Sequence, residues 1–161
     1  MKENQNLFRD LQEDFRKMKK NLLVAQSGGP TAAINATLAG VIKQAIKEEQ
    51  IDQVYGACYG IQGVLEQKFV NLTEKVDTEE KLEKLKRTPA AALGSCRFKL
   101  NDIKEDDSQY QEIVDILHKM NIGYFVYIGG NDSMDTVAKL SAYCKEKGCL
   151  LYTSDAADEL D

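Results

Sequence analysis

The sequence predicts an α/β fold in which βαβ units build a mainly parallel sheet. Short apolar runs, at residues 21–26, 53–59 and 124–128, alternate with amphipathic segments of ten or more residues. Strands that alternate with helices of this length favour right-handed crossovers and a parallel sheet. With 161 residues, of which 43% are hydrophobic and 29% charged, the chain is long enough to bury one sizeable core. We therefore expect one domain of Rossmann-like βαβ layers.

The first predicted elements are a helix, a strand and a second helix. Residues 1–20 form an amphipathic pattern, with Leu7 or Phe8, Leu11, Phe15 and Met18 on one side. This helix would pack on the domain edge, join an oligomer interface, or remain a solvated terminal helix. The strand at 21–26 leads into the turn Ser27-Gly28-Gly29-Pro30, and a helix should follow over about 31–48. The predicted inner face of that helix consists of Ile34, Leu38, Val41, Ile42, Ala45 and Ile46.

The middle of the chain is less regular. A second strand is expected at residues 53–59, and 61–72 is punctuated by glycines, which indicates a hairpin or an irregular segment. Thr78, followed by two glutamates, has the character of an N-cap for a helix that runs to about Lys86. Residues 88–100 form a loop rich in small side chains.

The last predicted unit is helix, strand, turn and helix. A helix over about 107–121 precedes the strand at 124–128, and Gly129-Gly130-Asn131-Asp132-Ser133 forms the next turn. Ser133 is the expected N-cap of a helix that runs to about Lys147. The predicted inner face of that helix consists of Met134, Val137, Ala138, Ser141 and Cys144.

Composition excludes several classes of function. A net charge of −5 and a pI near 5.0 argue against nucleic-acid and anionic-membrane partners. No apolar run is long enough to span a bilayer, and residues 1–20 lack the apolar stretch of a secretion signal, so we expect a soluble, cytoplasmic protein. Four cysteines without a Cys-x-x-Cys pair, and one histidine, disfavour a zinc site and a disulfide framework. That histidine, His118, lies beside an apolar helical stripe and is interpreted as a surface or packing residue.

Two turns share one construction: an apolar strand, a Gly-Gly pair and a helix. In a parallel sheet such turns lie at the carboxyl edge, where ligands bind. Glycines allow the backbone to approach a ligand, and a helix N-terminus carries about half a positive charge, which suits phosphate. Many single turns of this kind are only tight connections. Neither turn has a Walker or Gly-x-Gly-x-x-Gly pattern.

Arg97 adds a cation after a run of small residues, 90–96. Small residues would let a guanidinium reach a phosphate. Without further context, the alternative is a surface arginine that follows a flexible loop.

Three motifs together resemble the phosphofructokinases, and more narrowly their pyrophosphate-dependent branch. They are Ser27-Gly28-Gly29-Pro30-Thr31-Ala32-Ala33-Ile34-Asn35, Leu93-Gly94-Ser95-Cys96-Arg97, and Gly129-Gly130-Asn131-Asp132-Ser133-Met134-Asp135-Thr136. The similarity runs from about Asn21 to Gly148. It implies a partial, phosphofructokinase-like sheet that forms the first part of a phosphoryl-donor domain.

The resemblance implies a reaction and a donor site. A phosphoryl group would pass from pyrophosphate to the 1-hydroxyl of fructose 6-phosphate, and a full-length member would form a homo-oligomer. Mg²⁺ and cationic groups would hold the transferring oxygens. The residues implied to bind the donor are Gly28, Gly29, Tyr59, Arg97, Gly130 and Ser133.

Two residues of the second turn are implied in metal binding and donor choice. Asn131 stands where many members have the aspartate associated with Mg²⁺, and Asp132 stands where ATP-dependent members have glycine. A carboxylate there would repel an ATP α-phosphate and leave room for pyrophosphate, so Asp132 is assigned to the catalytic centre. Either Asp132 would share Mg²⁺ binding with Asn131, or the metal would be held mostly by pyrophosphate oxygens. The alternative for Asp132 is a helix cap.

The sequence also departs from the family pattern. The Pro-Lys-Thr-Ile-Asp-Asn-Asp segment that carries the family's catalytic base has no counterpart here, so the chain is expected to be inactive alone. Residues 149–161 resemble the in-frame translation of a transposon-based sequencing adapter and are assigned to a non-native tail. The alternative is the next strand with an acidic terminus. Two other functions stay open: an ATP-dependent phosphofructokinase, and a non-catalytic phosphate- or nucleotide-binding module.

Overall fold

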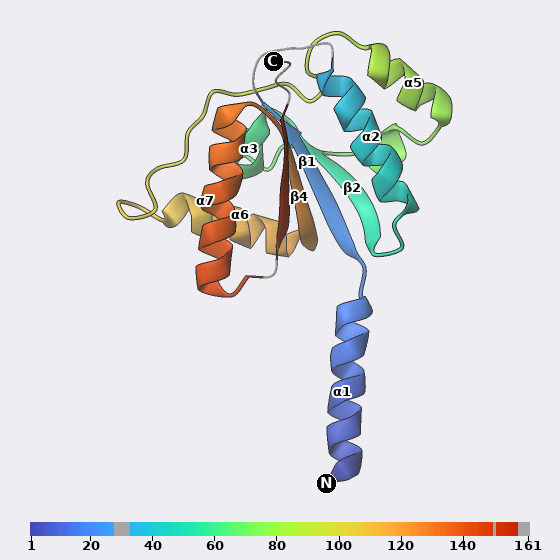
Figure 1. Ribbon diagram of the computed structural model, residues 1–161, viewed down its shortest axis with the longest axis vertical. Helices are drawn as coiled ribbons and strands as arrows, with labels where there is room; N and C mark the ends of the chain where they lie inside the picture. The colour runs from blue at the N-terminus through green and yellow to red at the C-terminus, as the bar shows by residue number, and fades with distance from the viewer. Residues whose placement is uncertain (28–32, 150, 158–161) are drawn as a thin grey trace.

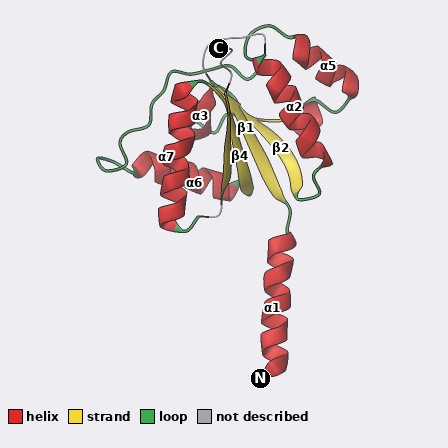
Figure 2. Ribbon diagram, viewed as in Figure 1, coloured by secondary structure: helices red, strands yellow, loops and turns green. Residues whose placement is uncertain are grey.

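The computed structural model describes residues 1–27, 33–149 and 151–157, and its centre is a five-stranded sheet. Helices flank the sheet on both faces (Figures 1 and 2). The strand order is β3-β2-β1-β4-β5, and β2 and β3 are the antiparallel pair in an otherwise parallel sheet. The strands are β1 (Lys20–Gln26), β2 (Ile51–Ala57), β3 (Phe69–Asn71), β4 (Ile122–Gly129) and β5 (Tyr152–Ala157). The predicted α/β class and mainly parallel sheet are confirmed.

The helices form two layers. The helices are α1 (Lys2–Lys17), α2 (Ile34–Lys47), α3 (Gly60–Leu65), α4 (Leu72–Lys75), α5 (Glu79–Arg87), α6 (Ser108–Lys119) and α7 (Asn131–Lys147). Buried residues of α2, α4 and α5 pack together on one side of the sheet, and those of α3, α6 and α7 on the other. Between the layers, β1 alternates: Leu22 and Val24 belong to the α2 side, Leu23 and Ala25 to the α6–α7 side. A central parallel strand buried on both faces accounts for its continuous apolar run.

Most of the predicted elements are present at nearly the predicted bounds. β1, β4, α2, α5, α6 and α7 each lie within a few residues of the expected positions. Thr78 caps α5 as expected, because its hydroxyl accepts a hydrogen bond from the Lys81 N–H at 3.2 Å. The loop at 88–100 carries no helix or strand.

Four expectations are wrong. β2 ends at Ala57, and Tyr59 adopts the left-handed conformation with φ of 67°. Residues 61–72 contain α3 and β3 and the first residue of α4 in place of a hairpin or irregular segment. The N-cap of α7 is Gly130, and Ser133 lies buried in the first turn. The inner faces include exposed residues: Ile46 on α2, and Met134 and Ala138 on α7.

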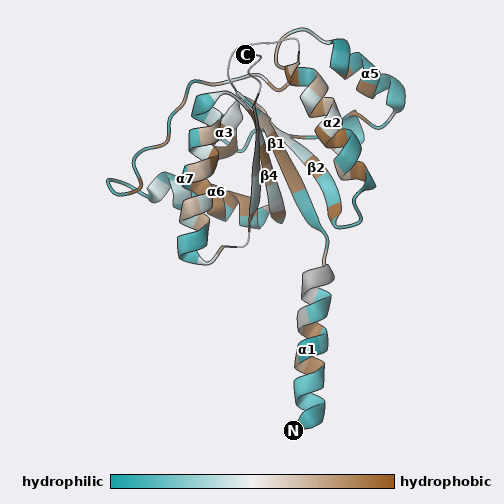
Figure 3. Cartoon of the chain, viewed as in Figure 1, coloured by the Kyte–Doolittle hydropathy of each residue, from teal (hydrophilic) through white to brown (hydrophobic). Residues whose placement is uncertain are grey.

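The N-terminal helix projects away from the sheet (Figure 1). The apolar residues Leu7, Phe8 and Leu11 of α1, and Met18 just after it, are exposed, and apolar bands interrupt an otherwise hydrophilic helix (Figure 3). The described part of α1 therefore does not pack on the domain edge. None of the helices within the described ranges is long and apolar enough to cross a membrane.

β5 lies within the segment 149–161 that the sequence assigns to a non-native tail. Its backbone pairs with β4 in parallel register, from Tyr124 beside Tyr152 to Gly129 beside Ala157. Backbone pairing does not test the origin of these residues, and the assignment stays a prediction. The functional site described below does not depend on β5.

Candidate functional site

The carboxyl ends of β1 and β4 lie side by side. Gln26 is beside Ile128 in the parallel register, and the Ser27 N–H donates to the Ile128 carbonyl at 2.8 Å. From β1 the chain crosses through α2 to β2 on one side, whereas β4 joins β1 on the other. This change of direction is a topological switch point, the usual place for a ligand in an open α/β sheet.

The turn that follows β4 presents the N-terminus of α7 at this edge. A Cβ atom on Gly129 would overlap Ser133 Oγ and the Ser27 carbonyl, so glycine is required for the two turns to approach. The Gly130 carbonyl accepts from the N–H groups of Ser133 and Met134, both at 3.1 Å. Asn131 and Asp132 are exposed in the first turn of α7. Asp132 does not act as a cap, since α7 has no side-chain cap.

Ser133 carries a buried hydroxyl at the same place. The residue is 2% exposed, and within the described part of the chain its Oγ has no hydrogen-bond partner. An unpaired buried hydroxyl costs about 1–3 kcal/mol. A ligand oxygen at the N-terminus of α7 would satisfy it, which fits the phosphate site expected there.

Gly28 and Gly29, the predicted contacts of the first turn, lie outside the described residues. Their neighbour Ser27 is described, and it is buried. The Ser27 hydroxyl donates to the Cys96 carbonyl at 3.0 Å. This bond brings the loop of Arg97 to the end of β1, 69 residues away in sequence.

Arg97 is exposed and forms no ion pair with the described residues. Its side chain is thus available to an anion. Tyr59 lies on the other side of the loop, where its N–H donates to the Leu93 carbonyl at 2.8 Å. Gly94, with φ of +74°, lies so close to the Tyr59 ring that a Cβ atom would overlap it. The structure therefore brings Tyr59, Arg97 and the second turn to one edge.

Two buried amides, which sequence reasoning did not single out as site residues, hold this loop in place. Gln26 Oε1 accepts from the Leu93 N–H at 2.8 Å, and its Nε2 donates to Asn35 Oδ1 at 3.2 Å. Asn35 Oδ1 accepts from the Ala92 N–H at 2.9 Å, and its Nδ2 donates to the carbonyls of Thr88 and Ala90. The available signal was a polar side chain on the buried stripe of an amphipathic helix for Asn35, and a polar residue at the end of an apolar strand for Gln26.

Tyr127 is buried beside the loop of Arg97. Its hydroxyl accepts from the Ile61 N–H at 3.0 Å and lies 3.9 Å from Cys96 Sγ. Burial, together with the smaller effect of the nearby Cys96 thiol, raises the pKa of Tyr127 to about 12. The phenol therefore stays neutral at physiological pH and serves as a fixed hydrogen-bonding group.

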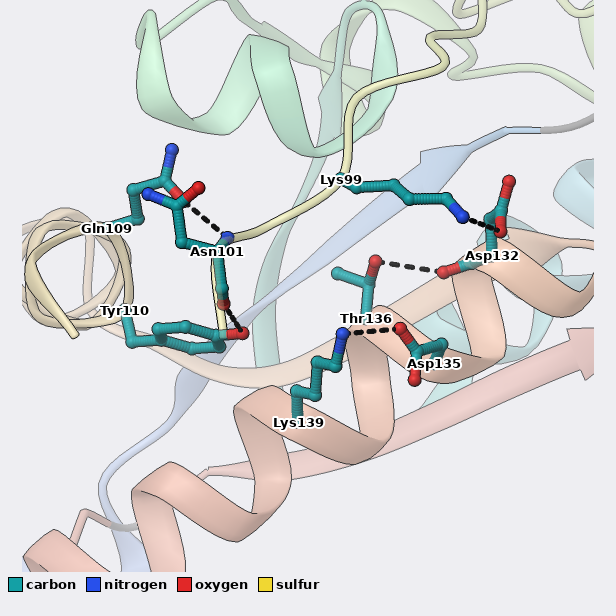
Figure 4. A network of polar contacts seen from close by, with 8 residues as sticks. All are labelled: Lys99, Asn101, Gln109, Tyr110, Asp132, Asp135, Thr136 and Lys139. Carbon is teal, nitrogen blue, oxygen red and sulfur yellow. Dashed lines mark hydrogen bonds and ion pairs between the residues drawn. The ribbon is translucent and has the colours of Figure 1, made fainter. Parts of the chain in front are cut away.

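Asp132 has a cationic neighbour that the sequence did not reveal. Lys99 Nζ lies 3.6 Å from Asp132 Oδ1, and Figure 4 shows the lysine reaching from the loop to the first turn of α7. Both side chains are exposed, at 75% and 70% of their surface. The loop of Arg97 and the turn of Asp132 thus meet directly.

A pocket of about 560 Å³ lies elsewhere, between α7 and the residues that precede α6. It is lined by Asp102, Ile103, Lys104, Asp107, Lys139, Tyr143, Glu146 and Lys147. Its acidic and basic side chains balance, so it has no net attraction for an anion. The carboxyl edge of β1 and β4, with a helix N-terminus and a free arginine, is the better phosphate site.

Comparisons with known proteins agree with this geometry. Residues 21–154 match the family described as Phosphofructokinase. A pyrophosphate–fructose 6-phosphate 1-phosphotransferase of Rhodospirillum rubrum is 44% identical over 123 residues, which cover 76% of this chain and 29% of that protein. The protein of the same name from Halomonas elongata is 40% identical over 129 residues, with 80% and 30% covered. The chain spans about 30% of the length of these curated relatives.

Solved structures give the same result. The crystal structure of a pyrophosphate-dependent phosphofructokinase from Nitrosospira multiformis superposes with a TM-score of 0.74 at 37% identity. The match covers 82% of this chain and 32% of that protein.

Proposed function

Because the chain belongs to the phosphofructokinase family, we propose that it supplies the phosphoryl-donor site of a pyrophosphate-dependent transferase. The acceptor of the complete reaction is the 1-hydroxyl of fructose 6-phosphate. One observation carries the proposal: the loop of Arg97 and the turn of Asp132 meet at the switch point between β1 and β4. The relatives named for pyrophosphate support it.

The residues of this chain bind and orient the donor. The N-terminus of α7 attracts the diphosphate, the Arg97 guanidinium forms charge-assisted hydrogen bonds to its oxygens, and the Ser133 hydroxyl donates one more. Gly28, Gly29 and Gly130 leave room for the phosphates, and Tyr59 borders the site. In phosphoryl transfer, such positioning and charge neutralisation supply most of the acceleration.

Asp132 selects the donor. Two unit charges about 4 Å apart repel by about 4 kcal/mol at an effective dielectric constant of 20. An ATP α-phosphate beside Asp132 meets this repulsion, whereas the shorter pyrophosphate leaves that position empty. Since about 1.4 kcal/mol gives tenfold discrimination, one carboxylate is enough to set donor choice.

Mg²⁺ fits this edge of the sheet only if the phosphates of the donor supply part of its ligands. Among the described residues, no group of three or more His, Cys, Asp or Glu side chains is placed to hold a metal. Mg²⁺ is commonly held by one or two carboxylates together with substrate phosphates. Asp132 and Asn131 would be its protein ligands, and the bound ion would neutralise phosphate charge. A cytoplasmic location and a homo-oligomeric full-length enzyme complete the proposal.

The test is Asp132→Gly, with Asp135→Gly as the matched control one turn farther along α7. Calorimetric titrations of the chain with pyrophosphate and with ATP, both with Mg²⁺, give the ratio of the two affinities. We expect Asp132→Gly to lower the preference for pyrophosphate at least about tenfold and Asp135→Gly to leave it unchanged. An unchanged ratio of the two affinities in Asp132→Gly would contradict the proposal that Asp132 selects the donor. Binding of ATP but not of pyrophosphate by the unmodified chain would contradict the proposal that pyrophosphate is the donor.

A further inference from the structure

Lys99 leaves its loop on the same side as Arg97. Phe98 and Leu100 pack against the core beneath α6 and α7, whereas Arg97 and Lys99 are exposed. In this alternating arrangement residues i and i+2 share a side. The two cations therefore project together from the surface of the loop.

The loop is held at both ends. At one end the Cys96 carbonyl accepts from Ser27 Oγ at 3.0 Å. At the other, the Asn101 N–H donates to Gln109 Oε1 at 2.9 Å, and the Asn101 carbonyl accepts from the Tyr110 hydroxyl at 2.7 Å (Figure 4). The span between these anchors is four residues long, so Lys99 is directed at the turn that follows β4.

The partner of Lys99 has an unfavourable charge for its position. Asp132 lies in the first turn of α7, at the helix N-terminus proposed to bind an anionic donor. An isolated carboxylate there repels pyrophosphate as well as ATP. Lys99 Nζ, 3.6 Å from Asp132 Oδ1, offsets that charge. Because exposed ion pairs add little to stability, a contribution to folding does not account for this arrangement.

We propose that Lys99 is a positioning residue for the donor site: it holds the Asp132 carboxylate in place and offsets part of its charge, so that the carboxylate still repels an ATP α-phosphate beside it without rejecting pyrophosphate. This role rests on the proposed function, because it requires a diphosphate at the N-terminus of α7. Lys99 acts through Asp132 and not by direct contact with the reacting atoms.

Calorimetric titration of the chain with sodium pyrophosphate and MgCl₂ tests the role. We expect Lys99→Met to weaken binding about fivefold, the upper range for an exposed pair, and Lys99→Arg to restore it. Lys139→Met is the matched control. It removes the same charge from another surface ion pair, with Asp135 at 2.8 Å, and Lys139 lies about 10 Å farther along α7 than Asp132. It should leave binding unchanged.

A double-mutant cycle shows whether Lys99 acts through Asp132. In the Asp132→Asn background, Lys99→Met should change pyrophosphate binding by less than about twofold, because no carboxylate remains to be neutralised. A full fivefold loss in that background overturns the role as a positioning residue. Equal binding by Lys99→Met and the unmodified chain also overturns it, while the proposed donor function stands. If the unmodified chain does not bind pyrophosphate, both proposals fail.

Discussion

Two buried amides, Gln26 and Asn35, determine where the loop of Arg97 lies. Both are almost fully buried, and they bond to each other and to the backbone of residues 88–93. Buried polar groups of this kind are stable only when every partner is present. The amides therefore fix the loop more firmly than apolar packing alone.

Asn35→Ala should lower the free energy of unfolding by about 3 kcal/mol. The change removes three part-buried hydrogen bonds, from the Ala92 N–H and to two carbonyls, and each such bond contributes about 0.5–1.5 kcal/mol. Urea unfolding followed by circular dichroism measures the loss. Gln44→Ala is the control: Gln44 is exposed on the same helix, and its loss should change stability by about 0.5 kcal/mol at most. A loss below about 1 kcal/mol for Asn35→Ala would show that the loop is held by other contacts.

The raised pKa of Tyr127 predicts that the free energy of unfolding depends on pH. Burial raises its folded pKa to about 12, whereas an unfolded tyrosine titrates near 10. Between about pH 10 and pH 12 the unfolded phenol ionises and the folded one does not, so the free energy of unfolding falls as the pH rises. This stabilisation is complete below pH 10 and lost by about pH 12.

Tyr127→Phe isolates that contribution. At pH 8 the variant should be about 1–3 kcal/mol less stable, because the Ile61 N–H loses its acceptor. At pH 11 the difference from the unmodified chain should shrink by about 1.4 kcal/mol, since one pH unit above the unfolded pKa corresponds to that free energy. Urea unfolding at the two pH values gives both differences. A difference that does not change with pH contradicts the buried, neutral phenol.

At the level of single residues, the sequence points to charged and glycine positions for the candidate site but not to the groups that hold the loop of Arg97 in place. Arg97 and Asp132 stand out because they belong to recognisable motifs. Lys99 does not, since its pairing with Asp132 joins residues that are far apart in the chain. Serine is a residue type that often caps helices, so the sequence predicts Ser133 as the N-cap of α7. In the structure Gly130 occupies the N-cap position, and Ser133 is buried in the first turn.

At the level of elements, α5 shows how a local signal fixes a helix on the surface. Thr78 caps its first turn, and Leu82 is the buried residue that packs it against the α2 side of the core. Thr78→Ala should lower the free energy of unfolding by about 1 kcal/mol, and Thr78→Ser should retain most of it. Thermal or urea unfolding of the two variants compares them directly. Equal stability of Thr78→Ala and the unmodified chain would mean that the cap does not stabilise the fold.

Length decides which elements the sequence predicts. α2, α6 and α7 each have three or more turns, so the spacing of their apolar residues is clear. α3 has six residues and β3 three, too few to establish a period, and the left-handed Tyr59 that starts α3 has no sequence signal. The inner face of α7 begins with Ser133 and Thr136. Thr136 can be buried there because its Oγ1 donates to the Asp132 carbonyl at 2.9 Å, whereas the Ser133 hydroxyl has no partner among the described residues.

At the level of the whole molecule, the order of the strands assembles the site. The sequence places both glycine turns at the same edge of a parallel sheet, but it does not say that β1 and β4 are neighbours. Long-range bonds, such as that of Ser27 to Cys96, then bring the loop of Arg97 to the same edge. These contacts depend on the packing of both layers, which local sequence patterns do not contain.

We propose above all that a diphosphate binds at the edge formed by β1, β4 and the loop of Arg97. Amide chemical shifts of the ¹⁵N-labelled chain, recorded during a titration with pyrophosphate and MgCl₂, locate the bound anion residue by residue. We expect the largest shifts to fall on Ser27, on residues 96–99 and on the first turn of α7. Shifts confined to the pocket lined by Lys104, Lys139 and Lys147 would contradict it.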